Sequence, residues 1–271
     1  MLFLVATTTP FDRKGRVDHG RLRAHVLWLA AKGVDGFVPT GTTGEFLYLS
    51  SQEREAVHRT VLDAARGRPV YPCCWDPSPI TTAYLADAAR DNGASGVLMP
   101  PPLYYKVDDR VVLDGYRRLH EVVDLPLLAY HNPKYLRTGV TAETYATLRK
   151  EEVVVGLKDS SQDRFRLDRL SRADPGCVYA GGDRILEHAG RIPFLGGFIS
   201  GAGNVWPDLC LRIWRGGEHQ LAEALQDRLD RVEQGGGIRA YKSMLGMGCR
   251  FPLPEPTSAQ RQQLPEAEWE G

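Results

Sequence analysis

Lys158 is the residue best placed for covalent chemistry, because it directly follows the apolar run 153–157. A lysine at the end of a buried strand lies in a less polar environment than a surface lysine, and such an environment disfavours the charged ammonium form. An uncharged amine can act as a nucleophile. Tyr130 ends the preceding apolar run, 125–129, so a phenol and an amine end two successive predicted strands. The structural alternative is a lysine that merely caps a strand and extends its amine into water.

Polar and glycine-rich segments follow several of the other apolar runs. Residues 41–44 (Gly-Thr-Thr-Gly) could present backbone N–H groups and two hydroxyls to a carboxylate, since glycine allows close approach and threonine donates. The same residues could form an ordinary turn between a strand and a helix. Gly182 and Asp183 follow a later run, and the glycine-rich stretch 196–203 lacks the spacing of a dinucleotide-binding fingerprint. We expect these segments to face one mouth of the fold.

Short β-rich runs alternate with amphipathic, helix-like stretches, which is the pattern of parallel strands joined by helical crossovers. Helix-like patterns include 18–32 and 52–65, and Ser50 with Glu53 indicates the start of the second. Eight strand–helix units predict an α/β fold, a (β/α)8 TIM barrel, in which the carboxyl ends of the strands carry the active site. The predicted strands lie near 2–6, 35–39, 69–74, 96–99, 125–130, 153–158, 177–180 and 196–200.

The alternation of strands and helices ends near residue 215. The remainder shows helical patterns at 218–234 and 238–247, separated by three glycines, and then a proline-rich polar tail. We therefore predict a catalytic barrel over residues 1–215 and a short C-terminal helical extension over residues 216–271. The tail should lie against the barrel or fray.

The composition argues against several classes of partner. The chain has 34 basic and 34 acidic residues, so electrostatics gives no case for binding nucleic acid or an anionic membrane. No stretch approaches the ~20 apolar residues of a membrane helix, and the N-terminal residues show no cleavage-like pattern, so we expect a cytoplasmic protein. The five cysteines and seven histidines show no metal-binding spacing, and we expect no metal and no other cofactor.

Five motifs together resemble one family. The first is 41–45 (Gly-Thr-Thr-Gly-Glu), and the others are Tyr130 with Pro133, 156–159 (Gly-Leu-Lys-Asp), 182–183 (Gly-Asp) and 197–200 (Gly-Phe-Ile-Ser). Their order and approximate spacing are similar to those of the dihydrodipicolinate synthase / N-acetylneuraminate lyase family, over about three quarters of the chain. This resemblance implies a (β/α)8 barrel, usually tetrameric, and a class I aldolase that forms a Schiff base with pyruvate or another 2-keto acid.

The resemblance implies a role for the central motifs. Lys158 would attack the keto carbon of pyruvate and form an iminium that acts as an electron sink. Tyr130 would be the proton shuttle, with the hydroxyl of Thr42 as its relay. Thr43 and the backbone N–H groups of the turn that begins at Gly41 would hold the pyruvate carboxylate.

Further positions complete the site that the resemblance implies. Gly182 and Asp183 would bind substrate, and Ile199 would face the lysine through its main-chain carbonyl. Tyr104 matches the tyrosine that family members pass into the site of a neighbouring subunit, and Tyr105 is the alternative. The resemblance therefore implies a homodimer or homotetramer in which the dimer is required for catalysis.

The aldehyde substrate is left open by the sequence. Arg137 resembles the arginine with which dihydrodipicolinate synthases bind the carboxylate of their aldehyde, but it comes two residues late. Glu45 followed by Phe46 is shared with sugar-acid aldolases of the family, which need no arginine there, and so favours a 2-keto-3-deoxy sugar acid. The alternatives are condensation of pyruvate with aspartate semialdehyde, as in 4-hydroxy-tetrahydrodipicolinate synthase, and a catalytically silent barrel that binds a keto acid as a sensor.

Overall fold

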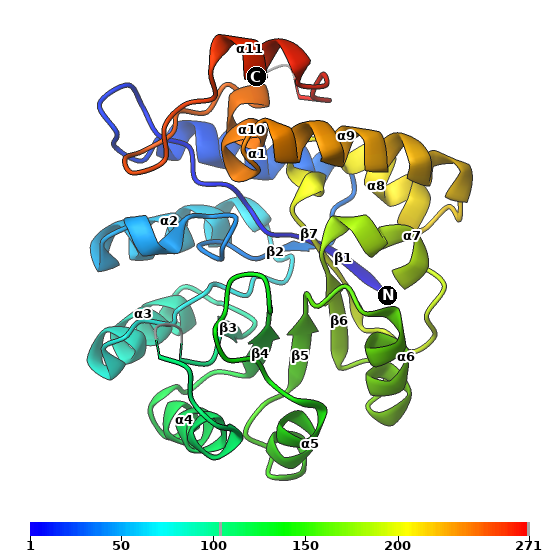
Figure 1. The fold of residues 1–271 in the computed structure, drawn as a ribbon. Helices are drawn as coiled ribbons and strands as arrows, with labels where there is room; N and C mark the ends of the chain where they lie inside the picture. Colours follow the sequence, from blue (N-terminus) through cyan, green and yellow to red (C-terminus); the bar gives the residue numbers. More distant parts are fainter. Residues whose placement is uncertain (103–104, 270–271) are drawn as a thin grey trace.

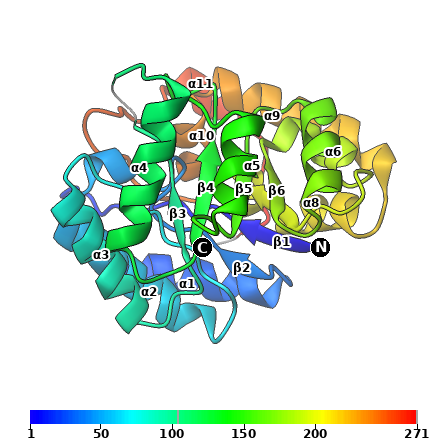
Figure 2. The same cartoon turned by 90° about the horizontal axis from the view of Figure 1, so that it is seen from below.

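The computed structural model describes residues 1–102 and 105–269. Its centre is a parallel sheet whose strands are hydrogen-bonded in the order β2-β1-β7-β6-β5-β4-β3. Helices surround this sheet on the outside (Figures 1 and 2). The strands are β1 (Leu2–Val5), β2 (Gly36–Phe37), β3 (Val97–Met99), β4 (Leu127–His131), β5 (Gly156–Asp159), β6 (Val178–Gly181) and β7 (Gly197–Ser200).

The segment 69–74 differs from the regular strand that we predicted there. It is joined to its neighbours by two isolated parallel bridges, one from Val70 to β2 and one from Cys73 to β3. Pro69 and Pro72 explain the difference, because proline has no N–H with which to continue a ladder. The two bridges nevertheless connect the two edges of the sheet, so the segment takes the place of the remaining strand and the predicted (β/α)8 barrel is confirmed.

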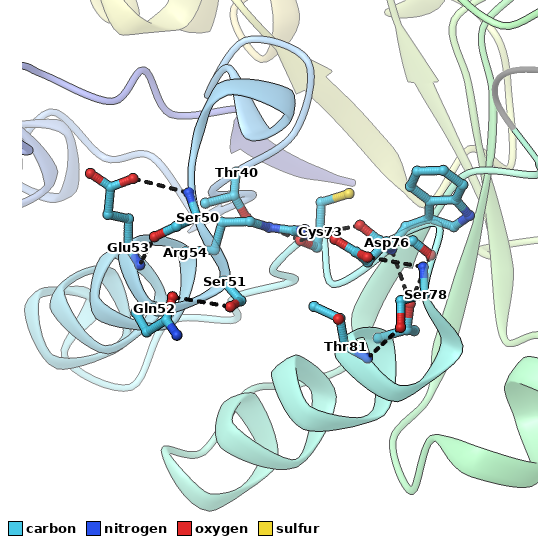
Figure 3. A network of polar contacts seen from close by, with 12 residues as sticks. Thr40, Ser50, Ser51, Gln52, Glu53, Arg54, Cys73, Asp76, Ser78 and Thr81 are labelled. Atoms are coloured by element: carbon cyan, nitrogen blue, oxygen red, sulfur yellow. Dashed lines mark hydrogen bonds and ion pairs between the residues drawn. The ribbon is translucent and has the colours of Figure 1, made fainter.

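A buried arginine supplies hydrogen bonds to this proline-containing segment. Arg54, in helix α2 (Ser51–Ala65), is only 2% exposed. Its Nη2 donates to the backbone oxygens of Cys73 and Trp75, both at 2.8 Å, and its Nη1 lies 3.4 Å from the carboxylate of Asp76 (Figure 3). The guanidinium therefore satisfies carbonyls at the end of this segment and directly after it.

The expected helices around the barrel are present. Ser50 caps α2, with its side chain accepting from the N–H of Glu53 and the Glu53 side chain accepting from the N–H of Ser50, as the sequence predicted. The other outer helices are α1 (His19–Ala31), α3 (Pro79–Asp91), α4 (Asp109–Val122), α5 (Ala142–Lys150), α6 (Arg164–Ala173), α7 (Leu186–Ala189) and α8 (Pro207–Trp214).

Alternation along the strands decides which side chains face the barrel interior. Ala129 and Leu157 belong to the cluster packed between the strands and the helices. Tyr130 belongs to the second, smaller cluster, with Leu4 and Leu128, that fills the inside of the barrel. Because successive side chains of a strand point to opposite faces, Lys158 points inward as Tyr130 does.

The C-terminal part is helical and contacts the barrel. Helices α9 (Ala222–Gln234), α10 (Ile238–Met244) and α11 (Ser258–Gln263) follow α8. The indole N–H of Trp206 donates to the backbone oxygen of Glu266 at 2.7 Å, so the described part of the tail lies against the barrel, as expected. The domain division at residue 215 stays a prediction. Within the described residues, no helix is long and apolar enough to cross a bilayer.

Candidate functional site

Lys158 and Tyr130 lie side by side on neighbouring strands. β4 and β5 pair in parallel with Tyr130 opposite Lys158, so both side chains leave the same face of the sheet at the same height. Lys158 is 6% exposed and Tyr130 is 5% exposed. The lysine Nζ lies 4.6 Å from the centroid of the tyrosine ring. The amine is therefore buried beside a phenol, which contradicts the alternative of a lysine extended into water.

The phenol oxygen of Tyr130 has two polar neighbours. The side-chain amide of Asn132 donates to it at 2.6 Å, and the hydroxyl of Thr42 lies 3.5 Å away. Asn132 itself is only 6% exposed. Because the amide N–H donates to the phenol oxygen, the phenol can direct its own proton toward Thr42 or toward a bound substrate.

The turn that contains Thr42 and Thr43 is tightly built. Two non-glycine residues with positive φ bracket it, Thr40 at 51° and Glu45 at 59°. A Cβ on Gly44 would lie 2.8 Å from the backbone N of Thr40, so only glycine fits there. Backbone strain of this kind persists where the surrounding structure fixes it, and it is frequent at functional sites.

A partly buried carboxylate, that of Asp183, lies near the turn, since a Cβ on Gly201 would come within 3.2 Å of its Oδ2 and within 3.7 Å of the hydroxyl of Thr43. Asp183 accepts hydrogen bonds from the hydroxyl of Ser200 at 2.5 Å and from the backbone N–H groups of Gly201 and Ala202 at 3.1 and 2.9 Å. Burial raises the pKa of Asp183, while these hydrogen bonds and the charge of Lys158 act in the opposite direction.

Glycines make room for the lysine side chain. A Cβ on Gly181 would lie 2.4 Å from the hydroxyl of Ser160 and 3.4 Å from Cε of Lys158. Gly182 has φ of 91°, and a Cβ there would lie 2.6 Å from Gln162. The two glycines therefore allow side chains from the loop after β5 to lie over the end of β6.

Most of the predicted residues line one cavity of about 220 Å³ at the carboxyl ends of the strands. Gly41 is buried in the turn beside it. Residues that the sequence did not indicate also line it, both from loops and from helices α9 and α10. The predicted lining residues are Thr42, Thr43, Tyr130, Lys158, Gly182, Asp183 and Ile199, and the additional ones include Asn132, Ser160, Gln162, Arg184, Glu233, Ile238 and Tyr241.

Besides Gly41, two further predicted residues are not placed in this cavity. Arg137 is exposed and is not among the described residues of the cavity wall, so the structure gives no support for its predicted contact with substrate. Arg137 lies in the loop that follows β4, and its absence from the cavity wall agrees with its late position in the sequence. Tyr104 lies outside the described residues, and its role stays a prediction.

The cations on the outer wall of the cavity are paired with acids of α9. Arg184 lies 2.8 Å from Asp230 and 2.9 Å from Glu233, and the amine of Lys134 lies 3.6 Å from the same Glu233. Glu233 is 63% exposed, so these pairs are at the solvent-facing rim. Throughout residues 1–102 and 105–269, no group of three or more His, Cys, Asp or Glu side chains is placed to hold a metal ion.

Comparisons with known proteins agree on one family. The profile of the dihydrodipicolinate synthetase family matches residues 2–245. An uncharacterized DapA-like lyase of Halobacterium salinarum is 31% identical over 88% of this chain and 81% of its own length. A 4-hydroxy-tetrahydrodipicolinate synthase of Rhodospirillum centenum is 31% identical over 95% of this chain and 94% of its own.

A solved structure extends the agreement to the fold. The dihydrodipicolinate synthase of Aquifex aeolicus superposes with a TM-score of 0.86 at 25% identity, covering 96% of this chain and 94% of that one. The resemblance found in the five motifs is thereby confirmed. The chain belongs to the dihydrodipicolinate synthetase family, and it is a pyruvate-dependent class I lyase of that family.

Proposed function

We propose that Lys158 forms a Schiff base with the keto carbon of a 2-keto-3-deoxy sugar acid and that the enzyme cleaves or forms the carbon–carbon bond next to pyruvate. The observation that carries this proposal is the buried amine of Lys158, 4.6 Å from the ring of Tyr130, in a cavity that Thr42 and Thr43 also line. A nucleophile, a proton donor and an anion-binding turn are the parts that such a reaction requires.

The chemistry begins at the amine. The uncharged Nζ of Lys158 adds to the keto carbon, the carbonyl oxygen takes one proton from the amine nitrogen and one from Tyr130, and water leaves to give an iminium. In cleavage, the electron pair of the breaking carbon–carbon bond moves into the iminium and forms an enamine. The departing carbon becomes an aldehyde as its hydroxyl proton passes to Tyr130. Protonation of the enamine and hydrolysis then release pyruvate and the free amine.

The remaining residues are assigned by their positions. Thr42, 3.5 Å from the phenol oxygen, relays the proton to and from Tyr130. Thr43 and the backbone N–H groups of the turn after Gly41 bind the carboxylate of the keto acid. Ile199, whose main-chain carbonyl would face the lysine, and Asp183 form further parts of the cavity wall.

The choice of a sugar acid rests on the side chains that line the rest of the cavity. The neutral polar side chains of Ser160 and Gln162 suit the hydroxyls of an uncharged aldehyde. The lining cations Lys134 and Arg184 are already paired with acids, and the exposed Arg137 is not part of the described wall. An aldehyde with its own carboxylate would therefore have to displace an existing ion pair.

The alternative substrate is aspartate semialdehyde. It is favoured by the relatives of about 30% identity that are named 4-hydroxy-tetrahydrodipicolinate synthase. Pyruvate release from 2-keto-3-deoxygluconate should be measured beside condensation of pyruvate with aspartate semialdehyde. Activity with only the second substrate would overturn the sugar-acid assignment.

The Schiff base has a direct test. The protein is incubated with pyruvate and sodium borohydride, and its intact mass is measured. We expect an increase corresponding to one reduced pyruvate adduct, mapped by peptide mass analysis to Lys158 and lost in Lys158→Ala. An unchanged mass would support the silent, keto-acid-binding barrel instead.

A further inference from the structure

Directly after the Gly41–Gly44 turn, Glu45 forms an ion pair with a helix of the C-terminal part. Its Oε1 lies 2.6 Å from the Nζ of Lys242 in α10. The side chains are 1% and 0% exposed, so the pair is removed from water almost completely. Among the ion pairs of the described residues, only this pair has both side chains at most 1% exposed. In the pair of Arg166 with Asp159, the arginine side chain is 15% exposed.

Burial of this ion pair costs desolvation free energy. It raises the pKa of Glu45 and lowers that of Lys242, and in each case the partner's charge acts in the opposite direction. The second oxygen of Glu45 finds no hydrogen-bond partner within the described residues. Since a buried ion pair is often no better for stability than apolar residues of the same volume, a need of the site explains the pair better than a need of the fold.

The site needs the ion pair because the backbone of the turn has an unfavourable conformation that must be held in place. Glu45 itself has φ of 59°, in the left-handed region that residues with a Cβ rarely occupy. The hydroxyl of Thr9 donates to the backbone oxygen of Gly44 at 2.8 Å, which holds the turn from one side. The carboxylate of Glu45 holds it from the other, because a change of backbone conformation there would pull the carboxylate away from Lys242.

The position of Lys242 is fixed in turn. Its Nζ lies 4.0 Å from the centroid of the Phe11 ring, and the guanidinium of Arg250 lies 4.4 Å from the same ring. In α10, Ile238 and Tyr241 line the cavity that contains Lys158. The same helix therefore contributes part of the cavity wall and the cation that contacts the turn.

We propose that Lys242 and Glu45 are positioning residues for catalysis: their ion pair holds the Gly41–Gly44 turn in the conformation that binds the keto-acid carboxylate. Helix α10 thereby becomes part of the active site although it lies outside the strand–helix units of the barrel. This inference rests on the proposed Schiff-base function.

The test is a double variant, Glu45→Gln with Lys242→Met, which removes both charges while nearly keeping the volume. We expect a folded protein whose KM for pyruvate rises on the order of tenfold, because the turn no longer keeps its geometry. The rate of borohydride-trapped adduct formation at low pyruvate should fall by the same factor. The matched control is Arg149→Met with Asp174→Asn, which removes a partly buried pair of 2.6 Å near the amino ends of β5 and β6 and should leave KM unchanged.

The outcomes are distinct. A folded double variant whose pyruvate KM and trapping rate stay within about twofold of wild type would overturn the positioning role. A wild-type protein that gives no adduct at all would overturn the proposed function instead.

If the double variant does not fold, amide hydrogen exchange of the wild-type protein provides a second test of the positioning role. Saturating pyruvate should slow amide exchange in residues 238–244 as well as in residues 40–46, because the two segments are coupled. Protection confined to residues 40–46 would contradict the inference.

Discussion

Asn132 is hydrogen-bonded to the phenol of Tyr130, the proposed proton shuttle. Its side-chain N–H donates to the phenol oxygen at 2.6 Å, and its oxygen accepts from the backbone N–H of Lys134 at 3.1 Å. A hydrogen bond donated to an oxygen becomes stronger as that oxygen gains negative charge, which happens when the phenol gives up its proton. Asn132 is therefore expected to favour the proton-transfer steps without contributing to the affinity for pyruvate.

The variant Asn132→Asp tests this expectation. Aspartate has nearly the same size and keeps the oxygen that accepts from Lys134, but it replaces the donor to the phenol by a carboxylate oxygen. Hydrogen bonds to charged groups contribute ~1.5–3 kcal/mol, so we expect kcat to fall about tenfold to a hundredfold. Steady-state pyruvate release measures kcat, and KM for the keto acid should change little.

The control for this prediction is a double-mutant cycle with Tyr130→Phe. Without the phenol oxygen, Asn132→Asp should have little further effect on kcat, because the interaction that it disrupts is already absent. Independent, multiplicative effects of the two substitutions would show that Asn132 acts on something other than Tyr130.

Among the secondary-structure elements, α2 has a role in closing the barrel. Arg54 donates to the carbonyls of Cys73 and Trp75, where the prolines of the segment 69–74 interrupt the ladder. Arg54→Leu removes the guanidinium that donates to the Trp75 carbonyl and one of the donors to Cys73 and Asp76, which also accept from Thr40 and Ser78. We expect a loss of ~3 kcal/mol or more in the free energy of unfolding. Urea denaturation followed by circular dichroism measures this loss.

Arg59 in the same helix provides the matched control for Arg54. Its side chain is 61% exposed and its ion pair with Glu55 spans 3.8 Å, so Arg59→Leu should change stability by no more than about 0.5 kcal/mol. Equal effects of the two substitutions would mean that the hydrogen bonds of Arg54 do not support the segment.

The elements also show what local sequence could and could not predict. Continuous apolar runs placed Lys158 and Tyr130 at strand ends, because a strand buried on both faces consists almost entirely of apolar residues. The bridges over 69–74 were missed because the apolar pattern does not weigh the missing N–H groups of Pro69 and Pro72. Tyr241 lines the cavity because α10 packs against the barrel, and this packing could not be predicted from a local sequence pattern.

The free energy of unfolding of the whole molecule depends on pH through two buried histidines, His25 and His58. Burial lowers the pKa of His25 to about 4 and that of His58 to about 3, from 6.5. As pH falls below 6.5, the unfolded chain binds protons that the folded chain does not, so stability decreases. The loss continues until pH reaches the folded values. Between about pH 7 and pH 5 we expect each histidine to reduce the free energy of unfolding by ~2 kcal/mol.

Urea denaturation at several pH values measures this dependence. His25→Gln should remove the ~2 kcal/mol that this ring contributes to the loss between pH 7 and pH 5, while the contribution of His58 remains. The exposed residue His120 supplies the control, because His120→Gln should leave the slope unchanged. A stability that is constant over this range would contradict the assignment of both buried rings as neutral.

The assembly of the molecule has its own test, which concerns the predicted donation of Tyr104 to a neighbouring subunit. Tyr104→Phe should then reduce kcat, whereas Tyr105→Phe, at a side chain that is 73% exposed, should have a small effect. On this prediction, both sites of a Tyr104→Phe homodimer lack the tyrosine hydroxyl, and both sites of a Lys158→Ala homodimer lack the amine.

Coexpression of the two variants decides between a shared site and a separate one. In a mixed dimer, the subunit that retains Lys158 receives Tyr104 from its partner, so one site of the two is complete. With random assembly into dimers, activity should recover to about a quarter of that of wild type. If Tyr104 instead acts within its own subunit, no subunit of the mixed dimer carries both residues. Activity would then stay at the level of the separate variants, and dimer formation would not be needed to complete the site.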